Sequence, residues 1–508
     1  MSAPSAPTAP EAQPGARPGK WWPLAAICLG NFMLLIDVTI VVTALPSMAR
    51  DLDAGFSDLQ WVMDLYALAL AALVMVAGTA GDLLGRRRVY VLGLAAFALA
   101  SLISGLAPNV GVLIAARAVQ GAAAAAMLAT NTPLLAAAYA GRDRAFAFGI
   151  WGAVSGAASA LGVLLGGVLT DYLDWRWIFY VNLPVCAVAL LITLRTVTES
   201  RGSASRIDWP GTVTFTLSAA ALTYGLIVGG EDGWGDGGAV TAFAVSAVAL
   251  VLFLLVERRT GEPLLDLRLL RRPSFAALMG AAVVLTGAAF AHYTYTMLWL
   301  QSVQGLSPIE AGLAVAPMAL TSFVFAGAGG RFLHRLPAWV AVSSGLALIG
   351  VGLLTQTAID AGSDWKVLLP GLIVTGLGVG VAIPVLVAAA LAAAPPERAG
   401  MASGAVNTFR QLGFALGVAV LGTIFSGRVR DVLTGAGLSP SAANAISGGA
   451  PFGSDPGLVQ EAYASALERV YLTAGFAALA AAVLVAAVAR RPARTPATAP
   501  APSPAPVH

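Results

Sequence analysis

Two charged residues stand inside stretches that are otherwise apolar and about as long as a bilayer is thick. Asp37 lies within residues 22–46, and Arg117 lies within residues 110–133. An ionised side chain at the bilayer centre costs about 2.5 to 3.5 kcal/mol on insertion scales, so each needs a partner or water. At 1.5 Å per residue, each lies about 10 to 13 Å below the same end of its stretch. We therefore expect the two side chains to face each other.

This pairing would be suited to handling protons. Burial disfavours the ionised form of Asp37, whereas a nearby guanidinium favours it, so a pH gradient or a cationic ligand could decide its protonation. Arg117 itself keeps its charge at any physiological pH. The alternative for Arg117 is a permanent ion pair without a role in transport.

Four further polar residues occur in apolar stretches and are candidates for a substrate path: Gln120, Asp64, His292 and Arg410. Asp64 would attract cations to an outer mouth or would simply be hydrated. His292 would either be hydrogen-bonded packing or relay protons. For Arg410, in the half of its stretch nearer the cytosol, the sequence leaves the function open.

The composition is that of a membrane protein. Hydrophobic residues make up 58% of the chain and charged residues 11%, with a mean hydropathy of +0.81. These values lie outside the globular range. The chain contains no Walker loop, paired metal spacing or serine triad, and its glycine run at 376–380 lies inside an apolar stretch. We therefore predict no enzyme activity, ATP use, nucleic-acid partner, metal or cofactor other than the proton.

The apolar pattern predicts an all-α polytopic protein with fourteen spans of about 20 residues each. Glycine-rich runs near 225–240 and 360–366 are expected to be turns. A weak internal repeat between residues 78–88 and 327–335 predicts two six-helix bundles with two inserted helices. The predicted spans are 22–46, 60–80, 88–107, 110–133, 146–170, 177–196, 209–229, 238–256, 275–299, 308–329, 337–358, 367–391, 401–425 and 470–490.

These spans divide the chain into six regions. We expect a disordered cytosolic tail at 1–21, a first bundle at 22–196, the inserted helices at 197–256, a cytosolic linker at 257–274, a second bundle at 275–490 and a second disordered cytosolic tail at 491–508.

The basic residues predict the orientation of the chain. Most of the 29 Arg and Lys residues fall on one side if the N-terminus is cytosolic, as the positive-inside rule requires. Because alanine, glycine and arginine are abundant, the composition also indicates a GC-rich bacterial genome. The predicted location is the bacterial plasma membrane, with both termini in the cytosol.

One cytosolic loop carries a motif that can latch a conformation. The segment 78–88 contains Gly78, Asp82, Gly85, Arg86 and Arg87. Gly85 permits a tight reversal between two helices, and the acid and arginines can pair or meet helix ends. With the Arg117-Ala-Val-Gln120-Gly121 segment and the segment 36–46 around Asp37, this loop resembles the signatures of the major facilitator superfamily.

Other segments resemble the fourteen-span proton-coupled drug exporters of that superfamily. They include Trp175-Arg-Trp-Ile-Phe-Tyr-Val-Asn182 and the glycine-rich segment 152–167. The resemblance implies the major facilitator fold, proton transfer at Asp37 and Arg117, and export of lipophilic or cationic compounds. Gly162, Gly166 and Gly167 would allow close helix packing. The expected partners are such small molecules and membrane lipids.

Two positions depart from the pattern of these exporters. Val163 stands where a proline is expected, and Val42 stands where an asparagine is expected. Both favour an alternative on the same fold, namely an importer or a dedicated exporter of a single metabolite. A membrane sensor that has lost transport is a third possibility, which the retention of Asp37 and Arg117 disfavours.

Overall fold

The computed structural model describes residues 20–202, 206–261, 263, 265–329, 336–393, 399–448 and 456–489. Most of both predicted tails, and the second copy of the repeated loop at 330–335, lie outside these residues. Within the described residues every regular element is helical. The longer elements are α1 (Trp22–Leu52), α2 (Phe56–Leu84), α3 (Arg86–Gly105), α4 (Val110–Ala138), α5 (Gly141–Tyr172), α7 (Asn182–Thr196), α8 (Trp209–Glu231), α9 (Gly237–Arg259), α11 (Pro273–Phe290), α13 (Pro308–Gly329), α14 (Ala338–Thr355), α15 (Leu369–Ala393), α16 (Ala399–Gly435) and α18 (Pro456–Ala489).

Short elements join or extend these helices. They are α6 (Trp177–Tyr180), α10 (Leu267–Leu270), α12 (His292–Leu298), the π-helix η1 (Trp299–Val303), the 3-10 helices η3 (Gln356–Ala358) and η4 (Trp365–Leu368), and α17 (Pro440–Ser447). Among the described residues, 13 helices are long and apolar enough to cross a membrane. The protein is therefore a multi-pass membrane protein.

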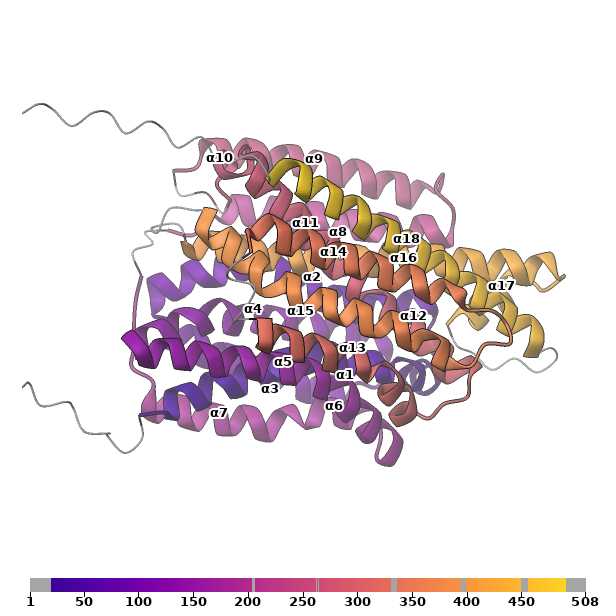
Figure 1. Ribbon diagram of the computed structural model, residues 1–508, viewed down its shortest axis with the longest axis horizontal. Coiled ribbons are helices and arrows are strands. Elements are labelled where there is room, and N and C mark those ends of the chain that lie inside the picture. The colour runs from indigo at the N-terminus through magenta and orange to yellow at the C-terminus, as the bar shows by residue number, and fades with distance from the viewer. Residues whose placement is uncertain are drawn as a thin grey trace, which may run out of the picture.

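The long helices lie side by side in two groups (Figure 1). Helices α1 to α7 pack on one another, and α11 to α16 pack on one another and on α18. Helices α8 and α9 form a separate pair, in which α8 contacts both α2 and α16. The inserted pair therefore lies beside the seam between the two bundles.

We call the two ends of the bundles the Trp22 side and the Leu52 side, after the first and last residues of α1. The Trp22 side also carries the α2–α3 turn and α10, and the Leu52 side carries α6 and α17. Figure 1 shows α10 and α17 at opposite ends of the molecule.

Three elements differ from the expected spans. Helix α8 continues to Glu231, so the glycines at 225–230 are helical and the predicted turn at 225–240 is wrong over that part. Helix α18 begins at Pro456, well before the predicted start at 470, because a helix can run on beyond the apolar core with its charged residues in the aqueous layer. The span at 275–299 is interrupted at Ala291, between α11 and α12.

Glycines bring α11 and α16 into direct backbone contact. A methyl group at Gly413 would meet the carbonyl oxygen and Cα of Val283, and one at Gly417 would meet Gly287. Small residues at such crossings let backbones approach closely, and this packing holds helices together in lipid. The crossing positions the part of α16 that carries Arg410.

We predict that Gly413→Ala lowers the thermal unfolding temperature of the purified protein in detergent. The added methyl group forces the two backbones apart, at a cost of about 1 to 3 kcal/mol. Gly427→Ala is the matched control on the same helix, because nothing lies within 4 Å of its added methyl group. That control should be neutral or slightly stabilising. Equal shifts for the two variants would contradict the close contact.

Candidate functional site

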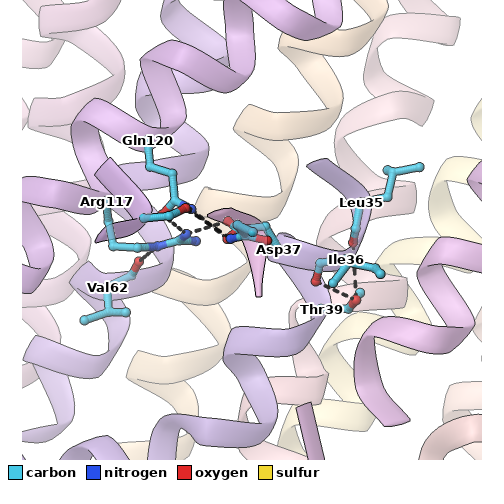
Figure 2. A network of polar contacts seen from close by, with 9 residues as sticks. Leu35, Ile36, Asp37, Thr39, Val62, Arg117 and Gln120 are labelled. Atoms are coloured by element: carbon cyan, nitrogen blue, oxygen red, sulfur yellow. Dashed lines mark hydrogen bonds and ion pairs between the residues drawn. The ribbon is translucent and has the colours of Figure 1, made fainter. Parts of the chain in front are cut away.

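Asp37 lies at the centre of a sealed polar cluster. Its Oδ2 accepts a hydrogen bond from Arg117 Nη1 at 2.6 Å, and its Oδ1 accepts one from Gln120 Nε2 at 2.8 Å. Oδ1 also accepts a bond from Asn182 Nδ2 at 3.2 Å. Figure 2 shows Arg117 and Gln120 converging on Asp37 from the neighbouring helix α4. The side chains of Asp37 and Arg117 are both 0% exposed.

Arg117 is held by more than this ion pair. Its Nε donates to the carbonyl oxygen of Val62 at 3.2 Å, and its Nη1 also donates to Gln120 Oε1 at 2.7 Å. The guanidinium carbon lies 4.1 Å from the centre of the Tyr66 ring, which is cation–π distance. Nη2 is buried with no hydrogen-bond partner among the described residues.

Gln120 belongs to this cluster and is not free to line a substrate path. Its amide oxygen accepts from Arg117, and its amide nitrogen donates both to Asp37 and to Ser101 Oγ, the latter at 2.9 Å. All the hydrogen-bonding groups of its side chain are thus engaged inside the protein.

Two members of the cluster were not predicted from the sequence, Ser101 on α3 and Asn182 on α7. Asn182 Nδ2 donates to both Asp37 and Ser101, the latter at 3.1 Å. Both residues are polar groups within apolar spans, and this was the available signal.

The geometry favours an ionised Asp37. Three nitrogen donors converge on its two oxygens, and a carboxylate is the form that only accepts hydrogen bonds. A buried charge without such partners would be strongly destabilising, whereas here the guanidinium and two amides replace the lost water. These contacts therefore account for a carboxylate that is sealed from water.

Glycines on α5 allow α1 to lie close beside it. A methyl group at Gly162 would collide with Thr39, and one at Gly166 with Thr43, both on α1. Gly167 lies against the backbone of Pro308 and Ile309, so it packs at the contact with α13 in the second bundle. Gly162 and Gly166 thus hold α1, the helix that carries Asp37, close to α5, and Gly167 joins α5 to the second bundle.

The α2–α3 turn is tied to the segment that follows α7. Arg86 pairs with Asp82 at 2.8 Å, and the backbone N–H of Arg86 donates to the carbonyl of Ser200 at 2.9 Å. The N–H of Gly202 donates to the carbonyl of Asp82 at 3.2 Å. Gly85 has φ of 112°, a conformation that favours glycine.

Glu199 is a further contact of this turn that the sequence analysis did not identify. Its Oε1 accepts from the backbone N–H of Arg87 at 2.9 Å, and a methyl group at Gly85 would collide with its carboxylate. The side chain of Arg87 donates to the carbonyl of Leu194. By contrast, a methyl group at Gly78 would make only an ordinary contact with Ala129. The loop is therefore joined to the end of the first bundle.

Asp64 lies in a sealed position, and not at an open or hydrated mouth. Its side chain is 0% exposed, and neither oxygen has a hydrogen-bond partner among the described residues. On α2 it lies one turn from Gln60, which bonds to the carbonyl of Val418, and two turns from Ala71, which accepts from Thr408. Asp64 therefore lies along the seam with α16.

His292 is buried in the second bundle next to the break at Ala291. Its Nδ1 lies 3.0 Å from the carbonyl of Ala288, and its ring packs against Tyr293 and Tyr471. Nε2 has no hydrogen-bond partner among the described residues. The structure does not bring His292 into the Asp37 cluster.

The two bundles are joined on the Leu52 side. Gln301 Nε2 donates to the carbonyl of Thr43 at 2.8 Å. Phe56 stacks on Phe425 with ring centres 6.1 Å apart, and Tyr295 lies 5.2 Å from Phe425. The Gln301 and Phe56 contacts therefore hold the second bundle against the first on the Leu52 side.

A family model described as Major Facilitator Superfamily matches residues 27–418. The chain belongs to this superfamily of transporters. The Multidrug resistance protein Stp of Mycobacterium tuberculosis is 37% identical over 405 residues, which cover 79% of this chain and 75% of the relative. The Puromycin resistance protein pur8 of Streptomyces alboniger is 37% identical, over 84% of this chain and 86% of the relative.

Further similarity extends to the fold and to other relatives. The Tetracenomycin C resistance and export protein of Streptomyces glaucescens is 32% identical, over 82% of this chain and 78% of the relative. The crystal structure of the human organic anion transporter MFSD10 superposes with a TM-score of 0.60, at 17% identity over 92% of this chain and 100% of that chain. At that identity the likeness concerns the fold alone.

We predict that Arg117→Gln is strongly destabilising, by about 3 to 5 kcal/mol, because it leaves a buried carboxylate without its counter-charge. Adding Asp37→Asn to this variant should restore part of the loss. Unfolding of the single and double variants in detergent measures the coupling.

Asp143→Asn is the control for that prediction, because Asp143 pairs with Lys20 at an exposed site and should cost at most about 1 kcal/mol. Additive effects at Asp37 and Arg117 would show that the two charges are not coupled.

Proposed function

We propose that this protein is a proton-coupled exporter of drug-like or antibiotic-like compounds. The observation that carries the proposal is the sealed cluster in which Arg117, Gln120 and Asn182 hold the carboxylate of Asp37. The names of the relatives support the direction of transport, because they describe resistance to or export of antibiotics. The proton would be the only coupling agent, with no cofactor, ATP or catalytic step.

The membrane arrangement that we propose has fourteen spans. Helix α5, 32 residues long, would be the span that joins the 13 helices identified by length and composition. The Trp22 side would face the cytosol of a bacterium, with both termini there, because it carries most of the arginines. The contacts around Phe56 and Gln301 would then close the outer side of the plasma membrane.

In this arrangement the described conformation is the one that has already released its proton. Asp37 is ionised and neutralised by Arg117, and the outer side is shut. When the bundles rock and the outer side opens, water would reach the cluster and Asp37 would take up a proton. Protonation removes the negative charge that holds Arg117, so the two helices α1 and α4 would separate more easily.

The return step would carry the proton inward. Closure of the outer side removes water from Asp37 and brings Arg117 and the amides back, which together favour loss of the proton toward the cytosol. The α2–α3 turn is linked to the segment after α7 through Glu199, so movement of the first bundle would be passed to the linker before the inserted pair. An amphipathic compound would occupy the space between the bundles during the movement that opens the outer side again.

We predict that inverted membrane vesicles holding an imposed proton gradient will release protons when an exported compound is added. The panel would contain puromycin, methylenomycin A, tetracenomycin C and cephamycin, the compounds that appear in the names of the relatives. Asp37→Asn should reduce the release to that of vesicles without the protein, because the only ionised carboxylate of the cluster is lost.

The control for this measurement is Asp143→Asn, which removes an exposed carboxylate and should leave proton release unchanged. If labelled compounds cross the membrane equally with and without the gradient, the chain is a facilitator or an importer, and the exchange mechanism fails. If no compound moves under any condition, the sensor alternative gains support.

A further inference from the structure

Arg410 carries a guanidinium that has no partner in the part of the chain that the structure describes. Its Nε is buried without a hydrogen-bond partner, and no described residue forms an ion pair with it. Only its backbone carbonyl is engaged, by the hydroxyl of Thr286 at 2.6 Å. The side chain is partly exposed although it lies about 16 Å along α16 from Ala399.

The sequence offers this cation no carboxylate nearby in its own bundle. From Pro273 to Leu421 the described acids are Glu310, Asp360 and Asp364, which lie at or outside the helix ends. The remaining described acids of this bundle, Asp431, Glu461 and Glu468, are exposed. Asp37 is already neutralised by Arg117, and Asp64 across the seam has no partner either. Among the described residues, therefore, no acid compensates the positive charge of Arg410 within its membrane span.

The contacts that α16 makes with its neighbours show on which side of this helix Arg410 lies. Thr408 and Val418 contact α2, and Thr423 donates to the carbonyl of Leu226 on the inserted helix α8. At about 100° per residue, Arg410 lies about 140° around the helix from Thr423. It therefore lies on the side of α16 turned away from the inserted pair, next to the α11 contact.

An arginine in this position cannot relieve its charge by losing a proton. Its planar fork of N–H groups fits a carboxylate or similar oxyanion through two parallel hydrogen bonds. Arginine, lysine and acidic residues inside membrane spans mark substrate pathways when they are not paired within the protein. The partner that Arg410 lacks among the described residues is therefore a negatively charged group.

We propose that Arg410 receives a carboxylate or similar oxyanion group of the compound that the protein exports. This inference rests on the proposed function and names a chemical class of substrate within it. It also differs from the cationic substrates expected from the sequence, because Asp37 is already paired with Arg117 and Asp64 is sealed from solvent. Arg410 would recognise the substrate, whereas Asp37 and Arg117 would handle the proton.

The test uses two dyes that differ only in this group. Rhodamine 110 carries a free carboxylate, and rhodamine 123 is its methyl ester. Binding of each dye to the purified full-length protein in lipid nanodiscs would be followed by fluorescence anisotropy. Wild type should bind rhodamine 110 more tightly than rhodamine 123. Arg410→Gln should weaken binding of rhodamine 110 by about tenfold, which corresponds to about 1.4 kcal/mol, and leave that of rhodamine 123 unchanged.

Arg410→Lys serves as the conservative variant and should keep part of the preference, because it retains the charge but not the planar fork. Thermal unfolding without dye gives a second measurement. Arg410→Gln should unfold at the same temperature as wild type or higher, since it removes an unpaired buried charge. A large fall would reveal a counter-charge within the protein and overturn the proposal.

The proposal is also overturned if the two dyes bind wild type equally, if neither binds, or if Arg410→Gln weakens both to the same extent. These outcomes are independent of proton exchange, which the vesicle measurement on Asp37→Asn reports. Loss of proton release in that variant together with an unchanged dye preference in Arg410→Gln would refute this inference alone.

Discussion

The burial of one carboxylate constrains the rest of this structure. Asp37 has no access to water, so its charge is stable only while Arg117, Gln120 and Asn182 stay within hydrogen-bond distance. These donors come from α4 and α7, and Ser101 on α3 orients both amides. Four helices of the first bundle therefore have one favourable arrangement when Asp37 is ionised. Protonation of Asp37 would therefore change which arrangement of these four helices is most stable.

The surrounding packing makes that arrangement specific. Gly162 and Gly166 let α1 approach α5 more closely than any larger residue would allow, and this contact sets the depth and rotation of Asp37. On the Leu52 side, Gln301 and the aromatic rings near Phe56 hold the second bundle against the first. Opening at this side breaks contacts between bundles, and the packing within each bundle is retained. Such rigid-body movement is how a buried site becomes accessible to each side in turn.

The two bundles differ in how the charged side chains within their membrane spans are paired. The first bundle contains a neutralised acid and base, whereas the second contains Arg410 without a counter-charge among the described residues. In a low-dielectric environment, these two arrangements differ greatly in their attraction for ions. In the proposed mechanism the paired site handles the proton, and the unpaired one receives the substrate.

The sequence predicted the helical membrane class and the superfamily, because apolar length and a few motifs are local properties of the chain. It also predicted that Asp37 and Arg117 could meet, since both lie at similar depth in their spans, and the structure pairs them. Asn182 and Ser101 were missed because which face a polar residue presents depends on helix rotation, which apolar spans do not encode. The sealing of Asp64 likewise depends on the seam with α16, whose residues lie far away in the chain. The continuation of α8 through its glycines depends on packing against α16, so local turn propensity was misleading there.

In the proposed mechanism, Asp37 is ionised when the Leu52 side is closed. Infrared difference spectroscopy of the purified protein, recorded while pH is lowered without substrate, measures this directly through the carbonyl band of a protonated carboxyl group. The account predicts that Asp37 contributes no such band at neutral pH, and that acidification produces a band that is absent from Asp37→Asn. A protonated-carboxyl band already present at neutral pH, and removed by Asp37→Asn, would contradict it.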